Sequence, residues 1–532
     1  MMRSGKTLET RGRLATTLVL NDKTRCRPKL EHFRNTVAAG ASRIVIAIND
    51  TCSEPSCVKT TTRLKPEAIL AYHPETNRLR RLIIPDRQNF RFSKLGQLLC
   101  VGVNKTMAIF VTAIRDREKV LRQSVILILL YLIPASQALL PIDDPDIWWH
   151  LRTGQWIIEH HTVPMTDPFS AYGMGKAWVA YGWLFDIVVY GLYTQLGLLG
   201  LVLFTVILSL MIAAALHHLV RRASLPFLIE IGITAVGLFC MKPVLTPRPW
   251  LFTILFFILE LHILLTARRS GSLRALYFLP LLFLVWANLH IEFVYGLALL
   301  GMMAAEPFVS KTLPFTPNKS HAESVPFSHM LIIAILCAGA TLANPYHVYL
   351  YQPFFEYAVQ TRVFQNIEEF HPMFFRSPED WLVLALGLGA AFSLGWHRET
   401  RPFPYFLFGM GALLAFRARR DAWVLVAASL ATISELQTNR VIQERIKLTP
   451  NQVFGVALGV ILSLFAFGYY RNISEASLKA HVAKIFPADA VAFVQKNNQH
   501  GPLYNHLDWG GYLIWALPDL PVSMDGRTNL HG

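Results

Sequence analysis

Residues Gly197–Arg222 read GLLGLVLFTVILSLMIAAALHHLVRR, with no Asp, Glu, Lys or Arg before the two final arginines. At about 1.5 Å per residue, a helix over this run is long enough to cross the ~30 Å hydrocarbon core of a bilayer. A pair of arginines at the end of such a run favours the cytoplasmic side of the membrane. The run therefore predicts a transmembrane helix that ends in the cytoplasm.

The composition indicates many such helices. The 532 residues are 53% hydrophobic and only 16% charged, whereas soluble domains are about 25% charged. Long apolar runs recur through most of the sequence, which excludes a disordered chain, a coiled coil, a collagen and a soluble enzyme. The six cysteines form no CxxC pair, so the sequence indicates neither a zinc site nor a disulfide framework. We expect an all-α polytopic membrane protein.

The N-terminal arm, residues 1–106, differs from the rest of the chain. Residues 1–120 carry 23 Lys and Arg against 10 Asp and Glu, which is +13 of the net charge of +15. The charge therefore belongs to the arm, and the expected partner is the bilayer and not nucleic acid. Two interpretations stay open. The arm is a basic regulatory segment with one short strand at ASRIVIAIND (41–50), or it is not native and translation starts at Met107, which we favour.

Basic clusters between the apolar runs predict the topology of a transmembrane domain over 107–470. The predicted spans are Ser124–Leu140, Gly197–Val220, Leu225–Met241, Leu251–Ala267, Ala275–Leu289, Phe293–Ala305, Met330–Leu342, Trp381–Trp396, Phe403–Phe416, Ala422–Ile433 and Val453–Tyr470. With about eleven crossings, every basic cluster lies in the cytoplasm except RARRD at 417–421. The loop 143–182 and all residues after 470 then lie outside, and Ile187–Leu196 is expected at the interface.

The C-terminal residues 471–532 have a different pattern. Pro487 opens a predicted helix over Ala488–Lys496, because proline suits the first helical turn. GPLYN and LPVSMDGR are predicted as strands, with a helix over GGYLIWAL between them. This alternation predicts a small α/β module on the outer face. The sequence ends soon after Arg527 with too little sheet to bury a core, so we expect it to be a fragment of a longer chain.

Three acids follow the first predicted span. Asp143, Asp144 and Asp146 lie within four residues in LLPIDDPDIWWHLRTGQWIIEHH. Repulsion within such a cluster raises at least one pKa, and the cluster can bind a divalent cation such as Mg²⁺ or Mn²⁺ or supply a general base. Alternatively, Asp143 and Asp144 only cap the helix that follows. The spacing alone does not separate these two interpretations.

The segment after the acids has the apolar spacing of a helix. Its apolar face is expected to lie in the membrane interface and comprises Ile147, Trp148, Leu151 and Ile158. Asp144 is shared by the DD pair and the DxD triplet, and it stands one turn before Trp148, whose ring could line a sugar site. We therefore expect Asp144 to act as the base and Asp146 to orient it or to hold a cation.

These motifs resemble those of the GT-C glycosyltransferases, which use polyprenyl-phosphate sugars and carry an acidic pair or DxD after the first helix. The resemblance is strongest to a bacterial branch similar to the dolichyl-phosphate-mannose protein mannosyltransferases. Its D-x-D-x-WWHL-x-x-G motif matches Asp144–Gly154, followed by PFS, Trp178 and WL at 183–184. Further matches are TPRPW (246–250), WANLH (286–290), ANPYH (343–347), NHLDWGGYLIWALP (505–518) and DGR (525–527). The resemblance covers residues 110–532 and not the arm.

The resemblance implies an inverting sugar transfer on the outer face of a bacterial cytoplasmic membrane. The donor would be a polyprenyl-phosphate sugar, and the acceptor a glycan, a lipid or a protein. A carboxylate would deprotonate the acceptor hydroxyl while the lipid phosphate leaves the anomeric carbon. Candidates to bind this phosphate are Arg248, Arg417 and Arg420, whose planar forks match its oxygens. If RARRD is instead a cytoplasmic loop, Arg248 is the remaining candidate.

Other polar and aromatic residues are candidates for sugar or acceptor binding. They are Trp148, Trp149, His150, His290, Glu292 and Glu369. An ionisable pair such as His290 and Glu292 at the end of a span is a functional hypothesis by default. Two other classes stay open, a lipid-linked sugar transporter or polymerase and a non-catalytic multi-pass membrane protein. Neither class needs the acidic cluster, so acid-to-amide changes would leave them unaffected.

Overall fold

The computed structural model describes residues 117–223, 225–312, 325–359, 365, 367–437 and 449–531, and four short strands nearer the N-terminus. The chain forms two compact units, Met1–Val111 and Thr112–Gly532. In the first unit, β1 (Thr17–Leu18) pairs in parallel with β2 (Val45–Ile46), and β3 (Ile69–His73) pairs antiparallel with β4 (Arg78–Leu82). The predicted strand at 41–50 contains β2. The rest of the arm, with Met107, lies outside the described residues.

The second unit is built of helices. After a first helix, Arg117–Ala138, they are α2 (Ile147–His160), α3 (Trp183–Leu196), α4 (Leu198–Val220), α5 (Phe227–Cys240), α6 (Trp250–Ser270), α7 (Leu279–Leu289), α8 (Phe293–Thr312), α9 (Phe327–Thr341), α10 (Gln352–Val359), α12 (Pro378–Trp396), α13 (Pro402–Arg417), α14 (Ala422–Gln437) and α15 (Pro450–Tyr470). The C-terminal helices are α16 (Glu475–Ile485), α17 (Ala488–Lys496), α18 (Leu507–Ala516) and α19 (Thr528–His531). Short 3₁₀ helices include η5 (Glu368–Phe370) and η6 (Arg419–Asp421).

Five of the described helices are long and apolar enough to cross a membrane. They are Arg117–Ala138, Leu198–Ala223, Trp250–Ser270, Phe293–Ser310 and Pro450–Tyr470. Shorter apolar helices cover Phe227–Cys240, Arg274–Leu289 and Phe327–Thr341. The helices α4 and α6 are largely buried by their neighbours, whereas α15 leaves most of its apolar surface exposed. An exposed surface of this kind suits contact with lipid chains, so this unit is an α-helical membrane protein.

Local signals in the sequence set where several helices begin. The hydroxyl of Ser377 accepts the backbone N–H of Asp380 at the start of α12. Thr449 and Gln452 form a capping box at the start of α15, and each of these helices has a proline in its first turn. These contacts satisfy N–H groups that would otherwise lack a partner.

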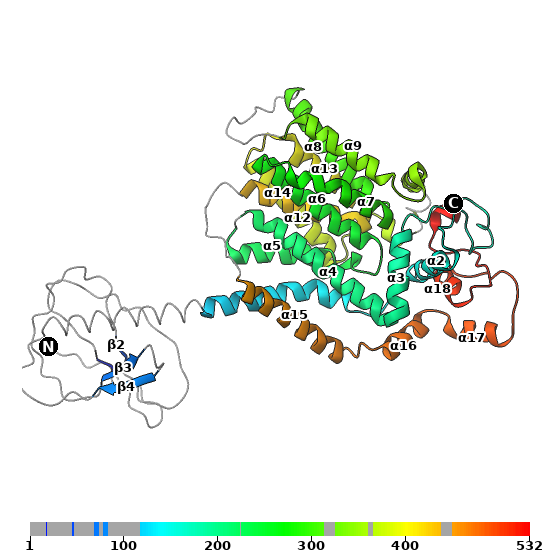
Figure 1. The fold of residues 1–532 in the computed structure, drawn as a ribbon, viewed down its shortest axis with the longest axis horizontal. Coiled ribbons are helices and arrows are strands. Elements are labelled where there is room, and N and C mark those ends of the chain that lie inside the picture. The colour runs from blue at the N-terminus through cyan, green and yellow to red at the C-terminus, as the bar shows by residue number, and fades with distance from the viewer. Residues whose placement is uncertain are drawn as a thin grey trace, which may run out of the picture. The chain divides into compact units, whose positions relative to one another are not determined.

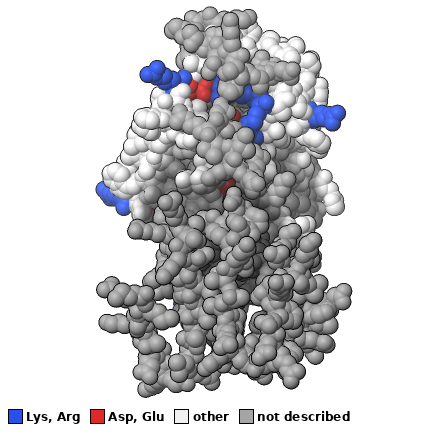
Figure 2. Space-filling view, turned by 90° about the vertical axis from the view of Figure 1, so that its left-hand side faces the viewer, with Lys and Arg blue, Asp and Glu red and all other residues white. Residues whose placement is uncertain are grey.

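Arginines and glutamates meet at one end of these helices, which we call the basic end. Its members are Arg222, Arg268, Arg269, Glu306 and Glu435. Arg222 and Arg269 bond the same oxygen of Glu435 at 3.0 and 2.9 Å, and Arg268 pairs with Glu306. Figure 2 views the side on which the first helix begins, where the described surface shows scattered Lys and Arg and little Asp or Glu.

Helix α2 packs against α3 and α18 at the end of the unit that carries the C-terminus (Figure 1). A Cβ on Gly154 would stand 2.1 Å from the carbonyl oxygen of Asp186, so the close approach of α2 to α3 requires glycine at this position. The ring of Trp148 meets those of Phe486 and Tyr512 at centroid distances of 5.6 and 5.2 Å. Most of the apolar face predicted to meet the membrane therefore meets protein.

The C-terminal residues follow the predicted helices but not the predicted strands. The predicted helix Ala488–Lys496 coincides with α17, and α18 contains all of GGYLIWAL except its last residue, Leu517. In the described residues, GPLYN and LPVSMDGR form isolated bridges, Leu503 with Val522 and Ser170 with Val522. Val522 thus pairs with the loop 143–182 as well as with Leu503 of its own module, and these described residues form isolated bridges and no separate sheet.

Candidate active site

A cavity of about 640 Å³ lies where the loops at one end of the helices meet. Its wall is formed by the start of α2, by the loop before α6 and by the loop after α7. The short helices η5 and η6 and the residues around α18 complete it. The residues predicted from the sequence that line it are Asp146, Trp149, His150, Arg248, His290, Glu292, Glu369, Arg417 and Arg420. Segments far apart in sequence therefore bring their charged side chains to one place.

Arg248 binds two of the three clustered acids. Its Nε donates to Oδ2 of Asp144 at 2.5 Å, and its Nη1 donates to Oδ2 of Asp146 at 2.6 Å. The other oxygen of Asp144 accepts the backbone N–H of Asp146 at 2.9 Å. One guanidinium thus offsets the repulsion between two neighbouring carboxylates.

A second arginine, Arg420 in η6, binds two other acids of the cavity. It bonds Glu292 at 2.8 Å and Glu369 at 3.3 Å, and Arg248 stands 3.8 Å from the same Glu369 oxygen. Burial alone would raise the pKa of Glu369, but Arg248 and Arg420 outweigh burial and hold that pKa below its usual value. Glu369 is therefore an ionised bridge between the two guanidiniums.

Aromatic rings support both guanidiniums. Arg248 and Arg420 lie 4.7 and 5.4 Å from the ring centre of Trp250, and Arg420 lies 4.5 Å from that of Phe370. A cation over a ring face is attracted by about 0.5–2 kcal/mol, depending on how far it is desolvated. This attraction uses the ring face and leaves the N–H donors to bind oxygen atoms.

Two carboxyl groups of the cavity have raised pKa values. Burial raises the pKa of Asp146 to about 6, opposed by Arg248 and reinforced by Asp144 and Glu369. Burial, with the charge of Glu292, raises the pKa of Asp421 to about 7. A general base is most effective when its pKa lies near the working pH. Asp146 and Asp421 both meet this condition and both line the cavity.

His150 has a partner that the sequence analysis missed. Its Nδ1 lies 2.5 Å from a carboxylate oxygen of Asp186, and both side chains are buried. Burial lowers the pKa of His150 well below its usual value, and the charges of Arg248 and His290 add to this shift. Asp186 lies in the first turn of the apolar helix α3, and a lone acid in such a run is the signal that could have identified it.

Three of the residues predicted from the sequence do not line the cavity. Asp143 bonds His481 at 2.5 Å, and its side chain is 67% exposed. Asp144 is buried against Arg248, and Trp148 faces the C-terminal helices. Of the two neighbouring tryptophans, Trp149 and not Trp148 lines the cavity.

Several lining residues had no role in the sequence analysis. They are Tyr181, Trp250, Tyr357, Asp508, Gly526 and Thr528, among others. Asp508 and Gly526 lie in the motifs NHLDWGGYLIWALP and DGR, so the resemblance had marked their neighbourhood without giving them a function. Tyr181 and Tyr357 lie outside the motifs and gave no signal.

Asp144 and Asp146 fit a divalent cation poorly in this arrangement. Both oxygens of Asp144 and one oxygen of Asp146 already bind N–H groups. In the described part of the chain, no group of three or more Asp, Glu, His or Cys side chains is arranged to hold a metal ion. Arg248 supplies the positive charge beside these two carboxylates.

Comparisons with known proteins find similarity to solved structures but not to family models or curated sequences. No family model matches the chain, and no curated protein gives a significant match. One similar solved structure is the crystal structure of the Archaeoglobus fulgidus oligosaccharyltransferase in the apo form, with a TM-score of 0.45 and 12% sequence identity. The match covers 76% of this chain and 64% of that one, so the chain spans less than two thirds of that enzyme.

Proposed function

We propose that this protein is a membrane glycosyltransferase that transfers a sugar from a polyprenyl-phosphate donor to an acceptor hydroxyl, with inversion at the anomeric carbon. The observation that supports it is the cavity itself. There Arg248 and Arg420 converge on one bridging acid, Glu369, beside Asp146, an acid with a pKa of about 6. Two guanidinium forks suit a phosphate, and such an acid suits proton transfer near neutral pH.

The donor phosphate would bind between the two arginines. Its oxygens would replace the carboxylate of Glu369, which stands 3.3 Å from Arg420 and 3.8 Å from Arg248. Negative charge grows on the phosphate as its bond to the anomeric carbon breaks. Fixed guanidinium groups stabilise that charge more in a site of low dielectric than they would in water.

Asp146 would act as the general base. The sequence favoured Asp144 for this role, but Asp144 does not line the cavity and binds N–H groups through both oxygens. We assign Asp144 to hold Arg248 and Asp146 to take the acceptor proton. The acceptor oxygen then bonds the anomeric carbon, and the electron pair of the broken bond leaves on the phosphate. The acceptor would be a hydroxyl of a glycan, a lipid or a protein.

The site would face the outside of a bacterial cytoplasmic membrane. With eleven crossings and the basic end in the cytoplasm, Asp146 and Arg420 would lie together on the outer side. Arg420 bonds Glu292, so RARRD lies at the cavity end and not at the basic end. Single cysteines at the exposed Thr166 and Asn498 should both react with an impermeant reagent added outside. Opposite accessibility would overturn this topology.

The test of the reaction is transfer from labelled polyprenyl-phosphate sugars in membranes that contain the protein. Asp146→Asn keeps the volume and removes the base, so transfer should fall by about 10²–10⁴. Asp143→Asn, at an exposed position outside the cavity, should transfer at the wild-type rate. Loss of transfer in Asp143→Asn alone would move the base to that residue. Wild-type transfer by Asp146→Asn and Asp144→Asn would contradict the carboxylate mechanism.

A further inference from the structure

We infer that the C-terminal segment Leu503–Thr528 is a structural part of the cavity, and that Gly526 is a positioning residue that holds the carboxylate of Asp146 against Arg248. The inference rests on the proposed function in that Asp146 is the base there. It extends that function because it assigns a role to a segment about 380 residues away in sequence. The supporting contacts lie on both sides of Gly526.

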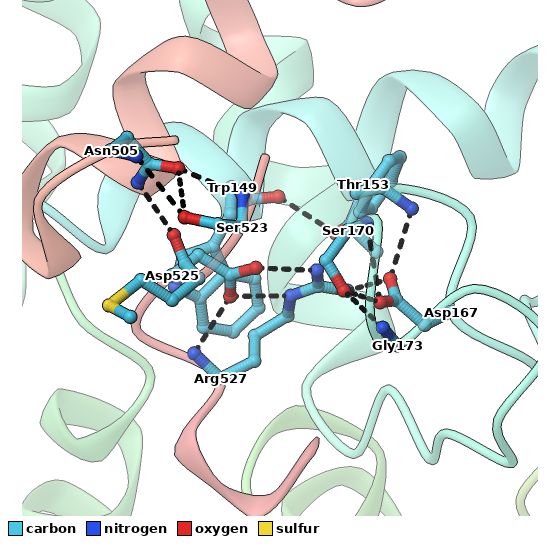
Figure 3. A network of polar contacts seen from close by, with 11 residues as sticks. Trp149, Thr153, Asp167, Ser170, Gly173, Asn505, Ser523, Asp525 and Arg527 are labelled. Carbon is cyan, nitrogen blue, oxygen red and sulfur yellow. Dashed lines mark hydrogen bonds and ion pairs between the residues drawn. The ribbon is translucent and has the colours of Figure 1, made fainter. Parts of the chain in front are cut away.

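Arg527 anchors this segment to the outer loop. It is 2% exposed, and its guanidinium bonds Asp167 at 2.6 Å and Asp525 at 2.7 Å. The same guanidinium lies 4.6 Å from the ring centre of Trp178 and 5.1 Å from that of Phe169. Figure 3 shows Arg527 between the two carboxylates, which come from the outer loop and the C-terminal segment. Breaking a buried ion pair of this kind is strongly unfavourable.

Backbone and side-chain hydrogen bonds align the residues before Arg527. Val522 accepts the N–H of Ala171 at 2.8 Å, and its own N–H donates to Phe169 at 3.3 Å. The amide of Asn505 donates to the carbonyl of Met524 at 2.8 Å. The chain therefore approaches Gly526 along a fixed path.

Gly526 then lies directly against the acid. A Cβ at this position would stand 1.8 Å from Oδ1 of Asp146, which no real contact permits. Gly511 makes a similar approach to the same loop, because its Cβ would stand 2.4 Å from the carbonyl oxygen of Pro145. The Oδ1 of this carboxylate thus faces Gly526 while its Oδ2 bonds the Nη1 of Arg248 at 2.6 Å, so a Cβ at residue 526 forces the side chain out of the rotamer that makes this ion pair.

The pKa of Asp146 depends on where its carboxylate lies among the surrounding charges, so a change of position can be measured as a change of pKa. The charged groups that act on it are Arg248 from the loop before α6, Asp144 from its own loop and Glu369 from η5. The hydroxyls of Tyr181 and Tyr357 also interact with it electrostatically. Arg248 is the cation among these groups, so moving the carboxylate away from Arg248 raises the pKa of Asp146 further.

Three glycine variants separate a positioning role from a folding role. Gly526→Ala pushes on Asp146. Gly510→Ala strains the same C-terminal loop from another side, because its Cβ would stand 2.1 Å from the carbonyl oxygen of Met524 and does not meet Asp146. Gly455→Ala on α15 meets no atom within 4 Å and serves as the matched neutral control.

Two readouts are measured on the purified full chain. The first is the pH profile of transfer, whose acid limb should move up by about 1–2 units in Gly526→Ala, since losing a nearby opposite charge shifts a carboxyl pKa by about 1–3 units. The second is an infrared titration of the carboxylic acid band that Asp146→Asn removes. Its midpoint should move up in Gly526→Ala and stay in place in Gly510→Ala and Gly455→Ala.

The outcomes separate this inference from the proposed function. A wild-type acid limb and infrared midpoint in folded Gly526→Ala would overturn the inference. Equal shifts in Gly526→Ala and Gly510→Ala would also overturn it, because the segment would then act only through folding. A shifted infrared midpoint in a protein that transfers no sugar would instead support the positioning role and reject the glycosyltransferase. If Gly526→Ala does not fold, Gly526→Ala with Asp146→Ala should restore folding, because the double variant removes the carboxylate that the new Cβ meets; failure of this pair would overturn the inference.

Discussion

Each end of the helical unit has one glutamate between two arginines, but the two bridges differ in tightness. At the basic end, Glu435 receives Arg222 and Arg269 at 3.0 and 2.9 Å, and its side chain is 9% exposed. At the cavity, Glu369 receives Arg420 and Arg248 at 3.3 and 3.8 Å, and its side chain is 30% exposed. The tight, buried bridge holds helices together. The looser bridge beside a cavity can exchange its glutamate for another anion.

The largest expected effect is on stability at the basic end. Glu435→Gln removes the charge that Arg269 and Arg222, which is 8% exposed, share, and breaking a buried pair costs about 3–5 kcal/mol. Thermal unfolding in detergent should show this loss, while the turnover per folded molecule stays at the wild-type value. A variant as stable as wild type would remove the distinction between the two bridges.

The next effect is on catalysis at the cavity. Arg420→Ala removes one of two groups proposed to stabilise the leaving phosphate, and loss of one such donor lowers kcat by about 10²–10³. Arg420→Lys keeps the charge without the planar fork and should fall between Ala and wild type. Labelled-donor kinetics would check both. Unchanged kcat in Arg420→Ala would show that the looser bridge is not a phosphate site.

The pH dependence of kcat/KM should reflect a group in the cavity and not one at the basic end. Burial raises the pKa of Asp146 to about 6, and the proposed base must be ionised. The rate kcat/KM is therefore full above that pH and falls about tenfold per unit as pH drops below it. Glu435→Gln should leave this limb in place. A limb that survives in Asp146→Asn would belong to another group.

The smallest effect concerns the rings beneath the arginines. Trp250→Leu removes the face that both cavity guanidiniums share, and about 0.5–2 kcal/mol of attraction corresponds to a donor KM raised by roughly 2–30-fold. Phe403→Leu, beneath Arg268 at the basic end, is the matched control and should leave KM unchanged. If Trp250→Leu and Phe403→Leu had the same KM for the donor, the donor phosphate would not bind at the arginines above Trp250.

Local pattern predicted the helices well. Ala488–Lys496 was predicted to the residue, because a proline at the first turn and a short apolar stripe are local signals. The predicted strands failed at Val522, which bonds a loop some 350 residues earlier, since sheet pairing depends on partners that a local pattern does not contain. The local sequence pattern therefore predicts where a helix lies, but it does not predict which distant segment a strand pairs with.

The same distinction applies to the site: local sequence signals predict some of its residues, and contacts between distant segments decide the others. Acids and arginines at the ends of apolar runs converge because the helix interiors exclude them, so Asp146, Arg248 and Arg420 could be predicted together. Consecutive residues on a helix point about 100° apart, and the packing of distant C-terminal helices decides that Trp149 and not Trp148 lines the cavity. Gly526 could not be found from sequence, because its contact with Asp146 exists only in the folded chain.

Glu369 has a consequence for how tightly a donor can be held. An incoming phosphate does not meet two bare cations, because Glu369 and the neighbouring carboxylates of Asp144, Asp146 and Glu292 already pair with them. Binding is then an exchange of one anion for another, and its free energy is the difference between two similar interactions. The same carboxylate can return to the arginines when the sugar has moved on, which displaces the spent lipid phosphate and shortens its residence. A glycosyltransferase of the proposed kind would give up some affinity for its donor and gain speed in releasing its product.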